Sequence, residues 1–156
     1  MQVITGRLAH FMSTRLPGVA GWWMRNQKRR FLAGGGQRGN KLWGRSTFLL
    51  EVVGRKSGQP RSVMLMLVPD GEDLLVAGSN GGNPNVPQWY RNLMAAGLAD
   101  VQVGTERWPV SFRQVEAEER DRCWKLLVAA YPDFAVYQEL TDREIPVAVL
   151  RRRSGD

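Results

Sequence analysis

The stretch FLLEVVGRKSGQPRSVMLM, residues 48–66, decides the fold that this sequence predicts. Apolar and β-branched runs at 48–53 and 62–68 are typical of strands. The residues between them include two glycines and a proline, which break the strand pattern. The stretch therefore predicts a strand, a turn and a second strand.

The turn between these strands is basic. Backbone N–H groups of a glycine-containing turn can form a concave anion site, a hydroxyl adds a donor, and cationic groups add charge-assisted hydrogen bonds. Such a turn suits a phosphate, although basic residues in a turn are also typical of a solvated hairpin. The side chains concerned are Arg55, Lys56, Ser57 and Arg61.

A second block, SNGGNPNVPQWYRNL at 79–93, follows the first. Together with the segments between and after them, the two blocks resemble the deazaflavin-dependent nitroreductase family, whose members bind coenzyme F-420. The resemblance extends over residues 47–150. It implies a split β-barrel and an enzyme that transfers a hydride from reduced coenzyme F-420 to a hydrophobic, electron-poor acceptor of the quinone or nitroaromatic type.

The resemblance also implies which residues contact the cofactor. The basic turn would bind the cofactor phosphate and the start of its glutamyl tail, and the next strand would run beneath the deazaflavin ring. Gly78 would permit close approach of the backbone to the ring. A helical segment would close the far side, although Trp89 and Leu93 at helical spacing also fit a core. The predicted cofactor contacts are Arg55, Lys56, Ser57, Arg61, Ser62, Val63, Met64, Leu65, Met66, Ala77, Gly78, Ser79, Asn80, Gln88, Trp89, Tyr90, Arg91 and Asn92.

An aromatic segment is implied to form the wall of the acceptor pocket. Tyr131, Phe134 and Tyr137 are three residues apart and would share one helical face, with Pro132 in an early helical position. Some family members carry Tyr where this chain has Phe134, which lacks the hydroxyl. We therefore expect the reduction of nitro compounds and of quinones by this protein to differ from that of such members. The predicted acceptor pocket consists of Met66, Ser79, Tyr131, Phe134 and Tyr137, and the candidates for polarising the acceptor or relaying a proton are Ser79 and Tyr137.

Length and composition favour a single domain with one core. The chain has 156 residues, of which 43% are hydrophobic. Strands are predicted at 48–53, 62–68, 73–78, 99–103, 107–115 and 146–151, and helices at 87–96 and 117–130. This pattern favours an α+β fold that is mainly antiparallel β, a split β-barrel of about six strands with flanking helices at 41–156. The net charge of +7 predicts an anionic partner, whether nucleic acid, acidic lipid or a phosphorylated cofactor.

Residues 1–30 differ from the rest because they combine Trp, Phe and Leu with many Arg residues. They predict an N-terminal extension, 1–40, of two short amphipathic helices broken at Pro17 and followed by a flexible glycine-rich linker. Two interpretations stay open: these side chains lie in a lipid headgroup layer, or a helix packs across the barrel with its Arg residues in water. We expect a cytoplasmic protein, with any membrane contact peripheral to the inner face of the cell membrane.

Few residues suit other chemistry. The only cysteine and histidine, Cys123 and His10, leave too few ligands for a typical zinc site, so we expect no metal. Cys123 lies in a helical pattern, where a packed thiol is favoured over a nucleophile. His10 has no carboxylate near it in the sequence, and no role is predicted for it.

Two other functional classes stay open. A protein of this fold can bind FMN, or carry a cofactor without turnover. The second of these classes is a basic module that binds a membrane surface or nucleic acid through its positive charge. The aromatic residues form no stacking strip among the basic ones, which disfavours nucleic acid. Split barrels often dimerise, and this analogy leads us to expect a homodimer.

Overall fold

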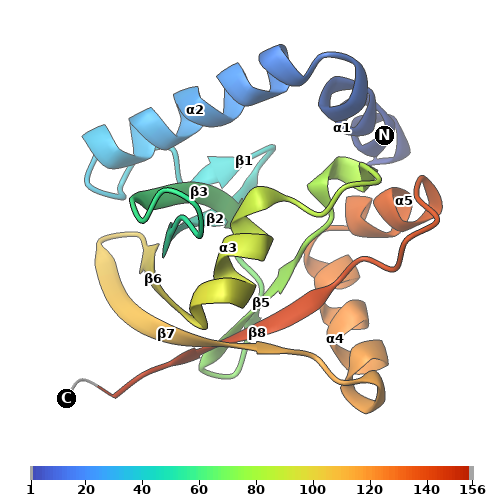
Figure 1. The fold of residues 1–156 in the computed structure, drawn as a ribbon. Coiled ribbons are helices and arrows are strands. Elements are labelled where there is room, and N and C mark those ends of the chain that lie inside the picture. Colours follow the sequence, from blue (N-terminus) through green and yellow to red (C-terminus); the bar gives the residue numbers. More distant parts are fainter. Residues whose placement is uncertain (1, 155–156) are drawn as a thin grey trace.

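A computed structural model describes residues 2–154, which form a curled antiparallel sheet with helices on its outside (Figure 1). In chain order the elements are α1 (Gln2–Arg15), α2 (Pro17–Ala33), β1 (Lys41–Leu42), β2 (Arg45–Val53), β3 (Pro60–Met66), β4 (Pro69–Asp70), β5 (Asp73–Ala77), η1 (Asn80–Gly82), α3 (Gln88–Ala96), β6 (Leu98–Val103), β7 (Glu106–Gln114), α4 (Ala117–Ala130), α5 (Asp133–Glu139) and β8 (Val147–Arg152). The predicted α+β split barrel is confirmed. The two-residue strands β1 and β4 were not predicted, because two residues are too few to produce an alternating pattern.

The sheet is continuous and antiparallel throughout. Its strand order is β1-β2-β6-β7-β8-β5-β4, and β3 pairs with β2 outside this path. The predicted turn joins β2 to β3 in the register Leu50↔Val63, while the other edge of β2 pairs with β6 in the register Leu50↔Val101. Because β2 has neighbours on both sides, it is a central strand, and its apolar run is accordingly almost fully buried.

The apolar residues of β2 serve two cores. Phe48 and Leu50 point into the barrel, where they pack with Tyr90 and Leu93 of α3. Leu49 points to the opposite face, as the alternation of a strand requires. A separate cluster lies between α4, α5 and the outer face of β5 and β8, and it includes the fully buried Cys123. The predicted packed thiol is therefore found, and burial raises its pKa.

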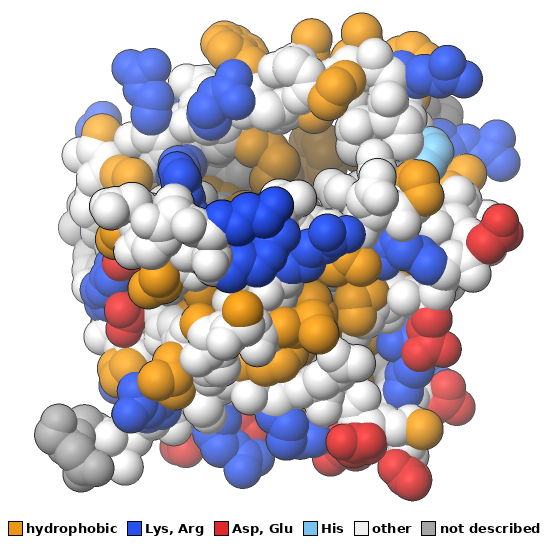
Figure 2. Space-filling view, viewed as in Figure 1, with side chains coloured by type: hydrophobic (Ala, Val, Ile, Leu, Met, Phe, Trp, Pro, Cys, Tyr) orange, Lys and Arg blue, Asp and Glu red, His pale blue; other side chains and the backbone are white. Residues whose placement is uncertain are grey.

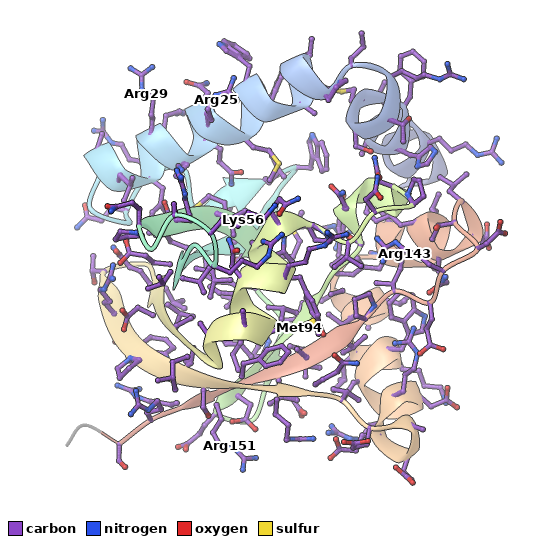
Figure 3. All side chains as sticks on the ribbon, viewed as in Figure 1. Arg25, Arg29, Lys56, Met94, Arg143 and Arg151 are labelled. Carbon is purple, nitrogen blue, oxygen red and sulfur yellow. The ribbon has the colours of Figure 1, made fainter. Side chains whose placement is uncertain are left out.

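Helix α2 lies across the sheet, along the upper edge in Figure 1. Phe31 is completely buried against Leu49 and Met64, which are paired residues of β2 and β3. The outward side chains of α2 include Arg25 and Arg29, which point away from the barrel (Figure 3). Pro17 is the first residue of α2, a position where its missing N–H costs nothing. The structure thus shows a helix that packs on the barrel, and no described helix is long and apolar enough to cross a membrane.

The glycine-rich segment after α2, which the sequence predicts to be a flexible linker, packs closely against neighbouring backbone. Gly36, with φ of +89°, approaches Gly104 so closely that a Cβ atom would lie 1.6 Å from its carbonyl oxygen. Gly39 also packs closely on the backbone of α2, where a Cβ atom would lie 2.8 Å from the Phe31 nitrogen. These glycines permit a compact turn that connects α2 to the sheet. The proposed division of the chain at residue 40 stays a prediction.

Candidate active site

A cavity of about 440 Å³ opens between the turn that joins β2 to β3 and the helix α3. Figure 2 shows a group of Lys and Arg side chains at the centre of this face, beside a hollow under α2. The structure brings together residues from three separate stretches of the sequence. The predicted contacts that line the cavity are Arg55, Lys56, Ser57, Arg61, Ser62, Val63, Gln88, Trp89 and Asn92.

Arg55 is held by α3. Its backbone N–H and its Nη1 donate to Oδ1 of Asn92, at 3.2 and 2.8 Å, and its Nη2 donates to Oε1 of Gln88 at 2.8 Å. Asn92 is 7% exposed, so this polar side chain is buried and paired at the base of the turn. Arg55 therefore fixes the turn to the helix, and the cations available for a ligand are Lys56 and Arg61, which take part in no ion pair among residues 2–154.

The turn itself is closed by its own hydrogen bonds. Gly54 N–H donates to the carbonyl of Gln59 and Gly58 N–H donates to the carbonyl of Gly54. Gly58 has φ of +69°, a conformation that glycine adopts without strain. Oγ of Ser57 accepts from the backbone N–H of Gln59 at 3.2 Å, which leaves the Ser57 hydroxyl proton free to donate to an anion.

Strand β3 contributes less to the cavity than predicted. Ser62 and Val63 line it, but Met64 points to the opposite face and is buried under α2 against Phe31. Leu65 packs on the barrel core. Successive side chains of a strand alternate between its faces, so the five residues from 62 to 66 do not all point toward one ligand. The side chains of Met64 and Leu65 therefore do not line the cavity, and their predicted cofactor contacts stay predictions.

Neighbouring residues in the first turn of α3 point to different places, one to the cavity and the next to the core. Trp89 is partly buried and lines the cavity, whereas Tyr90 is completely buried in the barrel with its ring 5.7 Å from that of Phe112. Burial also raises the pKa of Tyr90. Tyr90 is thus a core residue whose side chain does not line the cavity, and its role in closing the far side of the site stays a prediction. Arg91 is exposed and lies outside the cavity lining, while Leu93 is core.

The loop after β5 carries the next predicted contacts. Ala77, Gly78 and Ser79 are buried, and Asn80 begins η1 with φ of +48°. A Cβ atom on Gly78 would lie 2.8 Å from Pro146 and 3.1 Å from Tyr90. Glycine is therefore required at this position by the protein's own packing. The prediction attributed it to a cofactor, because the sequence does not reveal this long-range contact.

The aromatic residues after α4 converge as predicted. Tyr131 and Tyr137 place their hydroxyl oxygens 3.1 Å apart, and the ring of Phe134 packs edge-on against Tyr131 at 5.1 Å. Only Phe134 and Tyr137 belong to α5, because Pro132 precedes that helix and Tyr131 precedes Pro132. Met66 packs on the same cluster. Burial raises the pKa of Tyr137 to about 12, so its hydroxyl is neutral at physiological pH.

Residues 23–152 match the family model of F420H(2)-dependent quinone reductase. The chain belongs to this family. The F420H(2)-dependent quinone reductase of Mycobacterium tuberculosis is 36% identical to it over 110 residues, which make up 69% of this chain and 74% of that protein. Two solved structures are also similar. One is described as a domain-swapped dimer and has a TM-score of 0.67 at 40% identity. The matched region makes up 83% of this chain and 97% of the chain in that structure. The other is described as an F420-H2 dependent reductase and has a TM-score of 0.63 at 42% identity. Its matched region makes up 67% of this chain and 93% of the chain in that structure.

Membership of the F420H(2)-dependent quinone reductases confirms the resemblance drawn from the sequence and makes the chain an oxidoreductase that uses coenzyme F-420. The cavity suits the chemistry of that cofactor, since cations, a free hydroxyl proton and an indole ring lie on one wall. This agreement is one of charge and shape. The role of each lining residue stays a prediction.

The structure places one cation beside this candidate site that the sequence did not indicate. Lys28 of α2 donates from Nζ to the carbonyl oxygen of Ser62 at 3.1 Å, beside the cavity. It therefore places a further positive charge at the start of β3. Nothing in the sequence near Lys28 distinguishes it from Arg25 or Arg29, which point away from the barrel. Only the docking of α2 on the sheet selects it.

Proposed function

We propose that this enzyme transfers a hydride from reduced coenzyme F-420 to a quinone-type acceptor. The observation that supports this proposal best is the cavity between the basic turn and α3. Its wall combines Lys56 and Arg61 with the ring of Trp89, and no Asp or Glu among the described residues lines it. A ligand with a phosphorylated tail and a flat ring matches such a wall.

The residues divide the work of binding. Lys56, Arg61 and the Ser57 hydroxyl bind the phosphate and the glutamyl tail, while Arg55 keeps the turn attached to α3. The backbone of Ser62 and Val63 and the Trp89 ring support the deazaflavin. When bound, the reduced cofactor supplies the hydride, and the protein holds donor and acceptor at short distance and excludes water.

The acceptor lies, in this proposal, against Ser79 and the Tyr131–Tyr137 pair. A quinone that receives a hydride also takes up a proton, so a neutral hydroxyl near its oxygen is useful. The backbone of Tyr137 lies beside the loop that follows Ser79, since a Cβ atom on Gly82 would be 3.0 Å from the Tyr137 carbonyl oxygen, and its hydroxyl is paired with that of Tyr131. Ser79 and Tyr137 are therefore the residues that we propose to polarise the acceptor or relay the proton.

A titration tests the cofactor site. Purified protein is titrated with oxidised coenzyme F-420 and with FMN, and tryptophan quenching is followed in the wild type and in a Lys56→Ala, Arg61→Ala double variant. We expect selective binding of F-420, weakened at least about tenfold in the variant because two charge-assisted contacts are lost. Lys125→Ala, at an exposed cation on α4, is the control. Equal affinity of wild type and double variant would show that the tail binds elsewhere, and preference for FMN would favour the alternative cofactor.

Acceptor choice is tested at Phe134. This residue is 6% exposed and packs among Tyr131, Tyr137 and Trp124. We expect the wild type to oxidise reduced F-420 faster with menadione than with a nitroimidazole, and Phe134→Tyr to narrow the difference, because an added hydroxyl can stabilise developing negative charge. Steady-state oxidation of the cofactor measures both rates. An unchanged ratio would rule out a role for this position in acceptor choice.

We also infer a peripheral contact with acidic lipid. The first fifty residues contain nine Lys and Arg residues and no Asp or Glu. The side chains of Phe11, Trp22 and Trp23 on α1 and α2 are 51%, 58% and 54% exposed. Exposed tryptophans beside cations suit the headgroup layer of a membrane. The interaction rests on this combination of apolar exposure and charge.

Vesicle sedimentation tests this contact. We expect binding to vesicles that contain phosphatidylserine, weaker binding to pure phosphatidylcholine, and loss of binding in a Trp22→Ala, Trp23→Ala variant. Met94→Ala removes an equally exposed apolar side chain from α3 and is the control. Binding that persists in the double tryptophan variant would exclude α2 as the contact.

We propose in addition that the enzyme forms a homodimer. The relative described as a domain-swapped dimer supports this. In this chain, Val53 and Leu98 lie at the same end of the paired strands β2 and β6 and are about half exposed. Size-exclusion chromatography with light scattering measures the mass, and a monomer at every concentration tested would exclude the proposal.

A further inference from the structure

The loop of residues 78–85, here called the Ser79 loop, has a strained backbone. Three consecutive residues, Asn80, Gly81 and Gly82, have φ of +48°, +62° and +78°. A left-handed run of this kind is uncommon, and for Asn it carries a cost that surrounding contacts must offset. The loop closes with hydrogen bonds of its own, and contacts from outside the loop add to them.

Arg143 supplies most of these contacts. It lies between α5 and β8, and its guanidinium reaches the carbonyl oxygens of the Ser79 loop (Figure 3). Nη2 donates to Gly78 at 3.0 Å, to Ser79 at 2.9 Å and, more weakly, to Asn85 at 3.4 Å, and Nε donates to Asn83 at 2.9 Å. One planar group thus bridges both ends of the loop, which a lysine ammonium cannot reproduce.

Several other arginines on the sheet and α4 are used differently. Arg107, Arg113, Arg122 and Arg151 each pair with an acidic side chain at the surface. Arg143 pairs with no carboxylate among the described residues, and its Nη1 is buried without a hydrogen-bond partner there. Burial also lowers its pKa. The protein therefore accepts a desolvated guanidinium for bonds to loop carbonyls alone.

A second contact holds the loop from the opposite direction. Nδ1 of His10, on α1, lies 2.8 Å from the carbonyl oxygen of Gly81, so the histidine carries a proton on Nδ1 and donates it. Ser13, one turn further along α1, lies so close that a Cβ atom on Gly81 would be 2.9 Å from its Oγ. The loop is thus confined between α1 and Arg143.

We propose that Arg143 and His10 are positioning residues that hold Ser79 in place for hydride transfer. The proposal rests on the proposed function, because Ser79 lies in this account against the ring and the acceptor. Neither side chain is proposed to touch a reactant. Hydride transfer depends steeply on geometry, and a displacement of about 1 Å can lower a rate by about a hundredfold. Release of the loop should therefore affect turnover more than cofactor affinity, to which the basic turn contributes most in the proposed function.

The test compares Arg143→Lys and Arg143→Gln with the control Arg151→Lys, an exposed arginine of β8. We expect kcat with reduced F-420 and menadione to fall about tenfold or more in both Arg143 variants. We expect the Kd for oxidised F-420 to change less than about threefold in the same variants. Native-state hydrogen exchange should accelerate at the amides of Gly82 and Asn83, whose hydrogen bonds close the loop, and stay unchanged in β2.

Each other result overturns the proposal. Unchanged kcat and loop exchange would show that the contacts are dispensable, and a uniform rise in exchange with loss of F-420 affinity would show a general structural role. If the Arg143 variants do not fold, His10→Leu replaces them, and it should accelerate exchange at Gly82 and lower kcat severalfold. If wild-type protein does not oxidise reduced F-420 at all, the proposed function fails, while the exchange measurement still decides whether Arg143 and His10 hold the loop.

Discussion

At the scale of single residues, Asn92 shows how a polar side chain in a helix can organise a binding turn. Asn92 is a buried residue of α3 and is adjacent in the chain to Leu93, a fully buried core residue. The carboxamide oxygen accepts both hydrogen bonds from Arg55 and thereby connects α3 to the basic turn. The prediction placed Asn92 directly against the cofactor. In the structure it lines the cavity and also supports the residue next to Lys56.

Asn92→Ala should therefore loosen the turn more than it destabilises the protein. We expect the free energy of unfolding to fall by only about 1 kcal/mol, since Arg55 is exposed and can bond to water instead. The Kd for F-420 should rise severalfold, because the turn is no longer held against α3. Urea unfolding and fluorescence titration measure the two effects. Asn26→Ala on the exposed face of α2 is the control, and an unchanged Kd in Asn92→Ala would contradict this account.

At the scale of elements, α2 owes its place on the sheet to few anchors. Phe31 is completely buried against Leu49 and Met64, and Lys28 reaches the carbonyl of Ser62. Many of its other large apolar residues, such as Trp22, are about half exposed. A helix with one deep anchor and an exposed aromatic face differs from the evenly packed α3.

Phe31→Ala should consequently destabilise the whole fold. We expect a loss of about 3–5 kcal/mol, because the change leaves a cavity between α2 and the paired strands β2 and β3. Trp22→Ala, a larger deletion from the same helix, should change the free energy of unfolding by about 0.5 kcal/mol or less. Urea unfolding of both variants checks the contrast. Similar losses in the two would mean that α2 is not anchored through Phe31.

At the scale of the whole molecule, all three tyrosines of the chain are buried. Burial raises the pKa of each of them above its usual value, that of Tyr137 to about 12. Below pH 10 the hydroxyls are neutral in both the folded and the unfolded state. Above it, the unfolded chain releases these protons and the folded protein retains them, so stability falls as pH rises.

We therefore expect unfolding to become easier between pH 10 and 12. The loss should approach about 1.4 kcal/mol per pH unit for each tyrosine that is ionised only in the unfolded state. Urea unfolding at pH 9, 10 and 11 measures it, with Tyr137→Phe expected to reduce the slope by about one third. A stability that stays constant to pH 11 would show that these hydroxyls ionise readily in the folded protein.

Local patterns explain why so much of the architecture was predictable. Alternating apolar residues, turns rich in glycine and proline, and the two helical periods at 87–96 and 117–130 depend on neighbours in the chain. The structure contains these elements within a few residues of their predicted bounds. The basic turn was also recognisable, because its cations are contiguous. The packing roles of Tyr90 and Gly78 were not predicted, since their partners Phe112 and Pro146 lie far along the chain.

By itself, the sequence determined the split barrel, the basic turn of the candidate site and the set of aromatic residues, because each follows from the order of side chains over short distances. Only the tertiary structure decided that Arg55 is held by Asn92, that α2 contributes Lys28, and that Arg143 and His10 confine the Ser79 loop. These contacts join residues 34–71 positions apart. The physical reason is that such hydrogen bonds exist only once the sheet has closed and brought distant carbonyl and side-chain groups within about 3 Å of each other.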